Sequence, residues 1–303
     1  MRPRSLSLVV LVLVILFMAS SVYADELGST LITYAVLGGS GVTNASGGGL
    51  SATAITGNLG SSAGSASITG FPPGTVTGGT IQPGTEAAAQ LQLTTALTNL
   101  ALKGPGNLIG AGLLSNNSLG PGVYSVTSTA LDLTPNSTLT LTGTGEFVFL
   151  MSSSLTTGSG TTLDTSGLGA GSSVYWVLQS SGLATLGDNT DWAGNILSPT
   201  AITFDPGATI DCGRALAKTL VHFDGVGTVV ESGESALDPN TVGGGCTGNL
   251  VNSGGLNGGT TTGGGGGGGG GNSVPEPGTL LLLGSGFTAL GMARMRRVQA
   301  RRV

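Results

Sequence analysis

The chain has 303 residues, of which 8% are charged and 4% are aromatic, and its formal net charge at pH 7 is -5. Most arginines lie near the two ends, so the body between them keeps only Lys103, Arg214 and Lys218 as basic residues. So few cations cannot neutralise a run of phosphates, which excludes nucleic acid as a main partner. Few bulky side chains are present to fill a globular core, whereas each thin coil of a solenoid needs only one row of Leu, Ile or Val.

The first residues have the pattern of an export signal. Arg2 and Arg4 precede an apolar stretch at 8–18, and Val22-Tyr23-Ala24 supplies the small residues that a signal peptidase needs. We therefore predict a cleaved signal peptide over residues 1–24. A retained membrane anchor is the alternative, although the apolar run is shorter than the ~20 residues that span a bilayer.

From residue 122 onward the chain forms unequal repeats of strand, tight turn and strand. The repeats align as residues 130–140, 154–164, 183–193, 201–211 and 220–230. This alignment places Leu139, Leu163, Trp192, Ile210 and Val229 in one apolar column and Leu133, Leu186, Phe204 and Phe223 in another. Apolar residues alternate with Thr, Ser or Asp, which is typical of strands with one buried face. The pattern predicts a solenoid of stacked coils, in which His222 is an outward strand residue beside Thr203 and Thr185.

A single segment departs from this strand pattern. Residues 85–103 are rich in Ala, Leu and Gln and end at Gly104-Pro105, a common helix stop. Leu93, Ala96, Leu97 and Leu100 fall on one helical face, so the helix should lie along the solenoid. The alternatives are a partner-binding or a membrane-surface helix, but its polar face lacks the basic residues that the latter uses.

The chain has two cysteines, Cys212 and Cys246. Outside the inner membrane they would meet oxidising conditions, and a disulfide between them would tie the start of the following glycine-rich segment to the body. The alternative is a reactive or metal-binding pair. Neither cysteine forms a zinc-ligand spacing with His222, the only histidine.

The C-terminal end has three distinct parts. A Gly-rich linker at 243–273 leads into a segment at 274–303 that contains Pro275, Glu276 and Pro277, an apolar stretch and a cluster of arginines. This is the arrangement of a flexible tether, a marginal membrane segment and a basic stop. It resembles the Pro-Glu-Pro C-terminal (PEP-CTERM) sorting signal of Gram-negative bacteria. That resemblance implies processing by exosortase, transient anchoring in the inner membrane and delivery to the cell surface or extracellular polysaccharide.

Short motifs between residues 31 and 230 resemble one family. They are Tyr34-Ala35-Val36-Leu37, Val42-Thr43-Asn44, Ile55-Thr56-Gly57-Asn58-Leu59-Gly60, Ile68-Thr69-Gly70-Phe71-Pro72-Pro73-Gly74, Gly122-Val123-Tyr124, Phe147-Val148-Phe149, Val174-Tyr175-Trp176-Val177 and Gly213-Arg214-Ala215-Leu216-Ala217. Together they are similar to the ice-binding-like (antifreeze) family of secreted proteins from cold-adapted organisms. For residues 25–242 the resemblance implies an all-β fold with one long helix: a right-handed, irregular β-helix (solenoid) of triangular section with the α-helix packed alongside.

The resemblance also implies adsorption to ice through one flat face, which often carries a Thr-Ala/Gly-x-Thr pattern near the turns. Here the last position of that pattern is Thr in every coil but one, where Asp191 interrupts the column, and the first position is never Thr. This departure puts strong antifreeze activity in doubt. The predicted ice-binding residues are Thr138, Thr162, Thr209 and Thr228, with Thr156, Thr185 and Thr203 as a second set. Threonine is also a good strand former, so these columns could be ordinary wet sheet faces.

Other chemistry is less well supported by the sequence. Gly60-Ser61-Ser62-Ala63-Gly64 matches a nucleophile elbow, but this pattern is expected by chance in a chain rich in Gly and Ser. Stacked carboxylates such as Asp205 and Asp224 could bind calcium or act as in polysaccharide lyases, yet they more simply cap turns.

We therefore predict a protein that is not an enzyme and has no catalytic residue, metal or cofactor. Its partners would be ice or ordered water, with signal peptidase and exosortase during export and extracellular polysaccharide as a further candidate. The alternative is a structural or adhesion protein of the cell surface or extracellular matrix that lacks strong ice activity.

Overall fold

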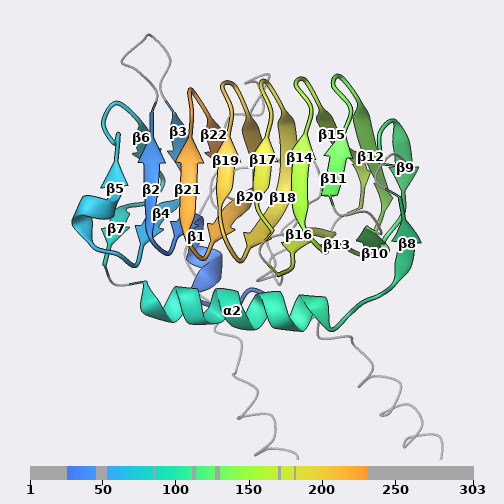
Figure 1. The fold of residues 1–303 in the computed structure, drawn as a ribbon, viewed down its shortest axis with the longest axis horizontal. Coiled ribbons are helices and arrows are strands. Elements are labelled where there is room, and N and C mark those ends of the chain that lie inside the picture. Colours follow the sequence, from blue (N-terminus) through green and yellow to red (C-terminus); the bar gives the residue numbers. More distant parts are fainter. Residues whose placement is uncertain are drawn as a thin grey trace, which may run out of the picture. The chain divides into compact units, whose positions relative to one another are not determined.

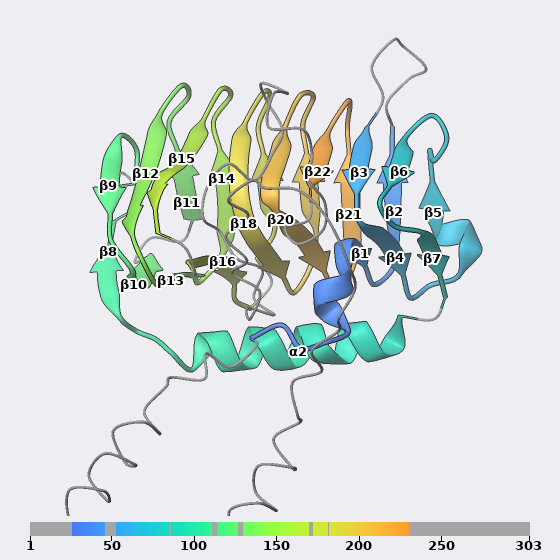
Figure 2. The same ribbon diagram turned by 180° about the vertical axis from the view of Figure 1, so that it is seen from behind.

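The computed structural model describes residues 26–45, 53–84, 86–110, 114–126, 130–169, 172–180 and 182–230. The predicted signal peptide, the Gly-rich linker and the sorting segment lie outside these ranges. Within them the fold is mostly β, with parallel sheets and one α-helix, as the sequence predicts. The strands are stacked as successive coils, and strands at the same position in each coil form one face (Figures 1 and 2). Each face is named after one of its strands or after the helix that covers it.

The β14 face is a 7-stranded parallel sheet with no register shift between its strands. In spatial order its strands are β11 (Ala130–Leu133), β14 (Ser154–Thr157), β17 (Ala184–Leu186), β19 (Ile202–Phe204), β21 (Leu220–Phe223), β2 (Gly41–Asn44) and β5 (Ile68–Thr69).

The β12 face belongs to the larger, 15-stranded sheet. In spatial order it contains β9 (Asn117–Leu119), β12 (Thr138–Gly143), β15 (Thr162–Leu168), the first residues of β18 (Asp191–Ser198) and of β20 (Thr209–Ala217), then β22 (Thr228–Val230), β3 (Ala54–Thr56) and β6 (Thr75–Thr77).

The helix-covered face holds the remaining strands of the larger sheet. These are β8 (Asn107–Ile109), β10 (Gly122–Val126), β13 (Glu146–Met151), β16 (Ser173–Leu178), the later residues of β18 and β20, then β1 (Tyr34–Gly38), β4 (Asn58–Ser61) and β7 (Ile81–Pro83). Strands β18 and β20 turn from one face to the other where Gly194 has a φ of 91° and Cys212 a φ of 52°.

The coils are not stacked in chain order. Strand β1 pairs with β20 through Val36 and Ala215, and β3 pairs with β22 through Ala54 and Thr228. The N-terminal coils therefore continue the stack beyond the C-terminal ones. Helix α2 (Ala87–Ala101) then runs back along the stack to β8 at its other end (Figure 1).

The coil registers confirm the predicted alignment of the repeats. Leu139 is in register with Leu163, and Ile210 lies between Trp192 and Val229. In the second predicted column, Phe204 lies between Leu186 and Phe223. All these side chains are buried inside the coils, so each coil contributes one row of side chains to a continuous core.

An aromatic ladder fills the middle of this core. The Phe149 ring stacks on Tyr124 at 5.3 Å between centroids and on Trp176 at 4.1 Å. Trp176 also contacts Trp192 at 4.7 Å, and its indole N–H donates to the carbonyl of Ala193 at 2.9 Å. These contacts link successive coils and fix their spacing.

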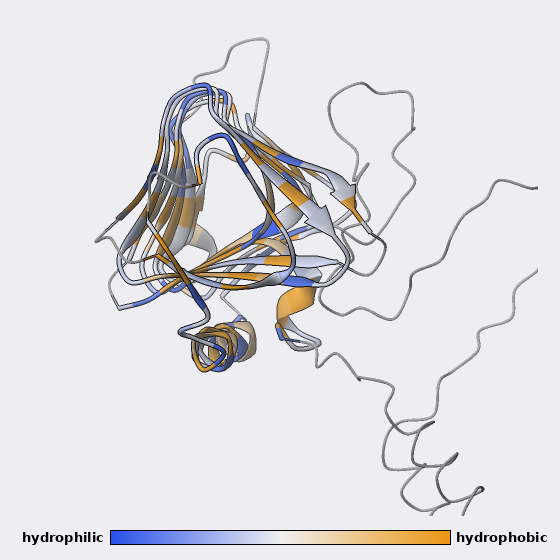
Figure 3. Ribbon diagram, turned by 90° about the vertical axis from the view of Figure 1, so that its right-hand side faces the viewer, coloured by the Kyte–Doolittle hydropathy of each residue, from blue (hydrophilic) through white to orange (hydrophobic). Residues whose placement is uncertain are grey.

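Helix α2 is slightly shorter than the predicted 85–103 but covers a flank of the stack as expected (Figure 3). Ala89, Leu93, Ala96 and Leu100 are buried, and Leu97 packs against the same cluster. Their partners are outward residues of the helix-covered face: Leu37, Val148, Leu150, Tyr175, Val177, Leu197 and Leu216. Strands β13 and β16 are therefore buried on both sides, which explains their unbroken apolar runs. No helix in the described part of the chain is both long and apolar enough to cross a membrane.

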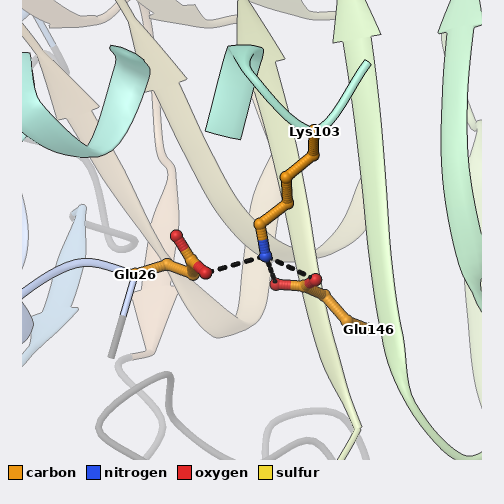
Figure 4. A network of polar contacts seen from close by, with 3 residues as sticks. All are labelled: Glu26, Lys103 and Glu146. Atoms are coloured by element: carbon orange, nitrogen blue, oxygen red, sulfur yellow. Dashed lines mark hydrogen bonds and ion pairs between the residues drawn. The ribbon is translucent and has the colours of Figure 1, made fainter. Parts of the chain in front are cut away.

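A charged network fixes the C-terminal end of α2. Lys103, just after the helix, contacts Glu26 at 2.7 Å and Glu146 at 2.7 Å (Figure 4). The hydrogen bonds and charges of these carboxylates raise the pKa of Lys103, although burial acts in the opposite direction as the largest single contribution. The first described residues, the helix end and strand β13 thus meet at one cation.

A buried arginine anchors the start of the body. Arg214 donates through Nη2 to the carbonyl of Ile32 at 2.7 Å and through Nη1 to Oδ1 of Asn195 at 3.1 Å. Ile32 belongs to the short 3-10 helix η1 (Leu31–Thr33), so Arg214 ties η1 to the coil stack.

Replacing Trp176 by Ala should destabilise the protein by about 3 to 5 kcal/mol, because it leaves a cavity in the ladder. The side chain is 0% exposed, and its loss would remove the ring that stacks on Phe149 and contacts Trp192. Urea unfolding measures this loss. Leu102→Ala is the control, since Leu102 is 77% exposed and its loss should change stability by less than about 0.5 kcal/mol. Similar losses in both variants would contradict the central role of the ladder.

Candidate functional site

The first set of predicted site residues lies in one row on the β12 face. Thr138 is in register with Thr162, Thr162 with Asp191, Asp191 with Thr209, and Thr209 with Thr228. The row continues through Ala54 to Thr75 in the N-terminal coils. We call this row the Thr138 column: Thr138, Thr162, Asp191, Thr209, Thr228, Ala54 and Thr75.

A second row lies beside it, two residues further along each strand. Thr140 is in register with Asp164, Ala193 with Asp211, and Thr56 with Thr77. The hydroxyl oxygens of Thr56 and Thr77 are 3.4 Å apart. We call this row the Thr140 column: Ser118, Thr140, Asp164, Ala193, Asp211, Val230, Thr56 and Thr77. Neighbouring positions on the β12 face thus repeat at about 4.7 Å between coils and roughly 6.6 Å along a strand.

The second predicted set lies on the β14 face. Thr156 is in register with Thr185, and Thr185 with Thr203. The complete row, which we call the Thr156 column, is Asp132, Thr156, Thr185, Thr203, His222, Thr43 and Thr69. The structure therefore does not bring the two predicted sets together on one surface.

His222 occupies the outward position that the repeat alignment predicts. Its Nδ1 lies 2.6 Å from the hydroxyl of Thr43, and its Nε2 lies 3.8 Å from Asp224. The hydroxyl of Ser62, the central residue of the elbow-like motif, is buried and has no hydrogen-bond partner among the described residues. Strand β4 before it leads into a short 3-10 helix (Ser65–Ser67) instead of the long helix that a nucleophile elbow requires.

Buried hydroxyls stiffen the turn that joins the β14 and β12 faces. The hydroxyl of Thr161 donates to the carbonyl of Gly158 at 2.6 Å, and the hydroxyls of Thr157 and Thr190 are 2.7 Å apart. Thr157 also accepts a hydrogen bond from the backbone N–H of Gly187 at 2.8 Å. These bonds cross-link successive turns beside the Thr138 column, so its backbone has little freedom to move.

Carboxylates interrupt both rows of the β12 face. Asp191, which is exposed, accepts a hydrogen bond from the hydroxyl of Thr209 at 3.2 Å. Burial, together with the charge of Asp191, raises the pKa of Asp211 to about 6. In contrast, hydrogen bonds from the side chain and backbone of Ser166 lower the pKa of Asp164.

A further group of carboxylates lies at the turns. Burial, followed by the charges of Asp188 and Asp224, raises the pKa of Asp205. Within the described ranges, no three His, Cys, Asp or Glu side chains are placed to hold a metal ion. Neighbouring carboxylates thus contribute, after burial, to the raised pKa of Asp205 and of Asp211.

Cys212 is buried at the bend of β20 and is engaged in a disulfide. Its predicted partner, Cys246, lies outside the described residues, so this pairing stays a prediction.

The alignment of repeats within the sequence did not include the outward threonines of the N-terminal coils. The repeat alignment began at residue 122, whereas Thr43, Thr56, Thr69, Thr75 and Thr77 precede it. The sequence does contain a pattern that could have identified them. In Ala54-Ile55-Thr56 and Thr75-Val76-Thr77 an inward apolar residue stands between two outward ones, as in the later coils. Only the pairing of β3 with β22 shows that these threonines extend the same rows.

A stack of parallel coils with a helix on one flank and rows of short hydroxyl side chains on its open faces defines a β-helical protein. Residues 36–227 match the model of the ice-binding-like family, and residues 273–297 match that of the PEP-CTERM protein-sorting motif. The chain belongs to the ice-binding-like family.

Relatives and solved structures are similar to most of the chain. It is 36% identical over 274 residues to an ice-binding protein of Nostoc sp. (strain HG1), covering 88% of this chain and 86% of the relative. An ice-binding protein from an Antarctic biological consortium has a TM-score of 0.57 and 34% identity, covering 67% of this chain and 89% of that one. One from the Antarctic ascomycete Antarctomyces psychrotrophicus has a TM-score of 0.55 and 26% identity, covering 68% and 98%.

Asp211→Asn should flatten the pH dependence of stability. Because the pKa of Asp211 is raised from 3.8 to about 6, the folded protein keeps a proton that the unfolded chain has already lost. Between about pH 4 and pH 6 this carboxyl therefore makes the free energy of unfolding fall as the pH rises. Urea unfolding across this window measures the difference in slope between the variant and the natural protein.

The control for this measurement is Asp132→Asn, which changes the net charge equally at the exposed edge strand β11. It should leave the fall in stability in place. Equal slopes for Asp211→Asn and the natural protein would show that Asp211 is not the group responsible.

Proposed function

We propose that this protein binds ice through the β12 face and that it acts as a binding protein, not as an enzyme. The observation that carries this proposal is the in-register Thr138 column in a chain that belongs to the ice-binding-like family. Relatives and solved structures named as ice-binding proteins support the same role.

The physical reason lies in what ice offers to a protein. Ice has no charge and no pocket, so a binder must hold many small groups at regular spacing. Threonine carries a hydroxyl and a methyl group, and its β-branched side chain is stiff in a strand. Each contact is weak, but bridging waters cost little and the contacts add along a rigid surface. The coil spacing and the cross-linked turns supply that rigidity.

The β12 face is preferred to the β14 face because threonines occur in two of its rows, the Thr138 and Thr140 columns. On the β14 face only the Thr156 column carries threonines, and His222 interrupts it between Thr203 and Thr43. The paired positions two residues earlier are Ala130 with Ser154 and Gly41 with Leu220. We therefore assign the main role to Thr138, Thr162, Thr209 and Thr228, and keep Thr156, Thr185 and Thr203 as the second candidate set.

We further propose that the coils wind in the right-handed sense with a triangular section. The alternation of the β14, β12 and helix-covered faces along the chain supports a three-sided section, and the view along the stack in Figure 3 is consistent with it. Such a section leaves each face one strand layer thick and level. The right-handed sense is what membership of the ice-binding-like family implies.

We propose export to the cell surface of a Gram-negative bacterium or beyond. The PEP-CTERM match at 273–297 supports processing by exosortase, with transient inner-membrane anchoring by residues 274–303. The Gly-rich linker at 243–273 stays a prediction from the sequence. Removal of residues 1–24 by signal peptidase stays a prediction from the sequence. Delivery to extracellular polysaccharide also stays a prediction, which nothing in the fold or the matched motif supports.

A second candidate function is a structural or adhesion protein of the cell surface or matrix with the same stack and no strong ice activity. One observation favours it: Asp191 lies in the Thr138 column, and Asp164 and Asp211 lie in the Thr140 column. Charged groups have no counterpart in an ice surface. The following experiment separates the two functions.

The double variant Thr162→Tyr and Thr209→Tyr should abolish inhibition of ice recrystallisation by the purified protein. Two bulky rings on the β12 face would hold the remaining threonines away from the crystal. The matched control is Thr156→Tyr and Thr185→Tyr, which places the same rings on the β14 face and should retain activity. Circular dichroism confirms that each variant is folded.

The outcomes are distinct. Loss of activity in the control alone would move the site to the β14 face. Absence of both recrystallisation inhibition and thermal hysteresis in the natural protein at micromolar concentration would remove the ice-binding function and leave the structural one.

A further inference from the structure

A carboxylate interrupts the Thr138 column on one coil, between Thr162 and Thr209. Strand β18 lies between β15 and β20 and places Asp191 in register with Thr162 on one side and Thr209 on the other. In the neighbouring Thr140 column, the same strand supplies Ala193, which is buried. This coil therefore offers no threonine to the β12 face in either column.

Asp191 also affects its neighbour on the next coil. Its Oδ1 accepts a hydrogen bond from the hydroxyl of Thr209 at 3.2 Å. The same hydroxyl also lies 3.4 Å from the carbonyl of Thr190, so its single proton has two acceptors within the protein. Position 191 therefore carries no threonine, and its carboxylate also accepts a hydrogen bond from the neighbouring Thr209.

A carboxylate at this position is costly when the face meets ice. Its bound water must be released or reorganised, and a surface without charge supplies no compensating partner. Threonine at the flanking positions has no such penalty, because its hydroxyl fits either a donor or an acceptor role.

We propose that Asp191 limits the affinity of the β12 face for ice, because it divides the Thr138 column into a Thr138–Thr162 part and a Thr209–Thr228 part. This inference rests on the proposed function and identifies the residue that sets its strength. A continuous row would let all these threonines order one water layer together, whereas two short rows bind separately.

The test is the variant Asp191→Thr in the full protein, assayed for inhibition of ice recrystallisation and for thermal hysteresis. It should inhibit at a severalfold lower concentration than the natural protein. Threonine suits a strand, and both in-register neighbours of residue 191 are already threonine, so the fold should be kept. Asp191→Ser is a second variant that restores a hydroxyl with a smaller side chain.

The matched control is Asp188→Asn, which removes the same charge without adding a threonine. Asp188 is exposed in the turn just before β18, so its replacement changes net charge equally but outside the column. A gain from the variants at 191 and none from the control supports the inference. Equal gains at 188 and 191 would overturn it, because net charge would then be the cause.

Failure of the inference differs from failure of the proposed function. If the natural protein is active and neither variant at 191 improves it, the inference is wrong and the β12 face remains the site. If the natural protein and all variants are inactive, the ice-binding function fails and the inference fails with it.

Discussion

In-register parallel pairing between thin coils is the constraint on which the rest of this structure depends. Side chains alternate between the two sides of a strand, so the register that places Leu139 beside Leu163 inside the stack also places Thr138 beside Thr162 outside it. A slip by one residue would bury hydroxyls and expose the core. The aromatic ladder and the buried hydroxyls at the turns oppose such a slip, because both connect neighbouring coils at fixed positions.

Helix α2 decides which surfaces are left for binding. It covers the face whose strands carry apolar residues on both sides, such as Val148 and Phe149 in β13. The β12 and β14 faces instead alternate apolar residues inside with threonines and carboxylates outside. The uncovered faces are therefore the candidates for the proposed binding surface, and they differ in the number of rows that carry threonines.

The electrostatics of the β12 face limit what it can bind. Its charged residues are carboxylates, and the proximity of Asp191 and burial already raise the pKa of Asp211. With few cations in the body, nothing in the described structure is arranged to recognise phosphate. A neutral, regularly spaced partner such as ordered water matches the threonines, while the carboxylates weaken that match.

The sequence by itself determined the strand period, the aligned coils from residue 130 onward, the single helix and the family, because these depend on local spacing and short motifs. Tertiary structure decided that residues 54–77 extend the threonine rows, that the two predicted threonine sets lie on different faces, and which face α2 covers. These features arise from pairing between segments far apart in the chain, such as Ala54 with Thr228. Periodicity along a strand specifies which side chains point outward, but only the stacking of coils specifies which of them become neighbours.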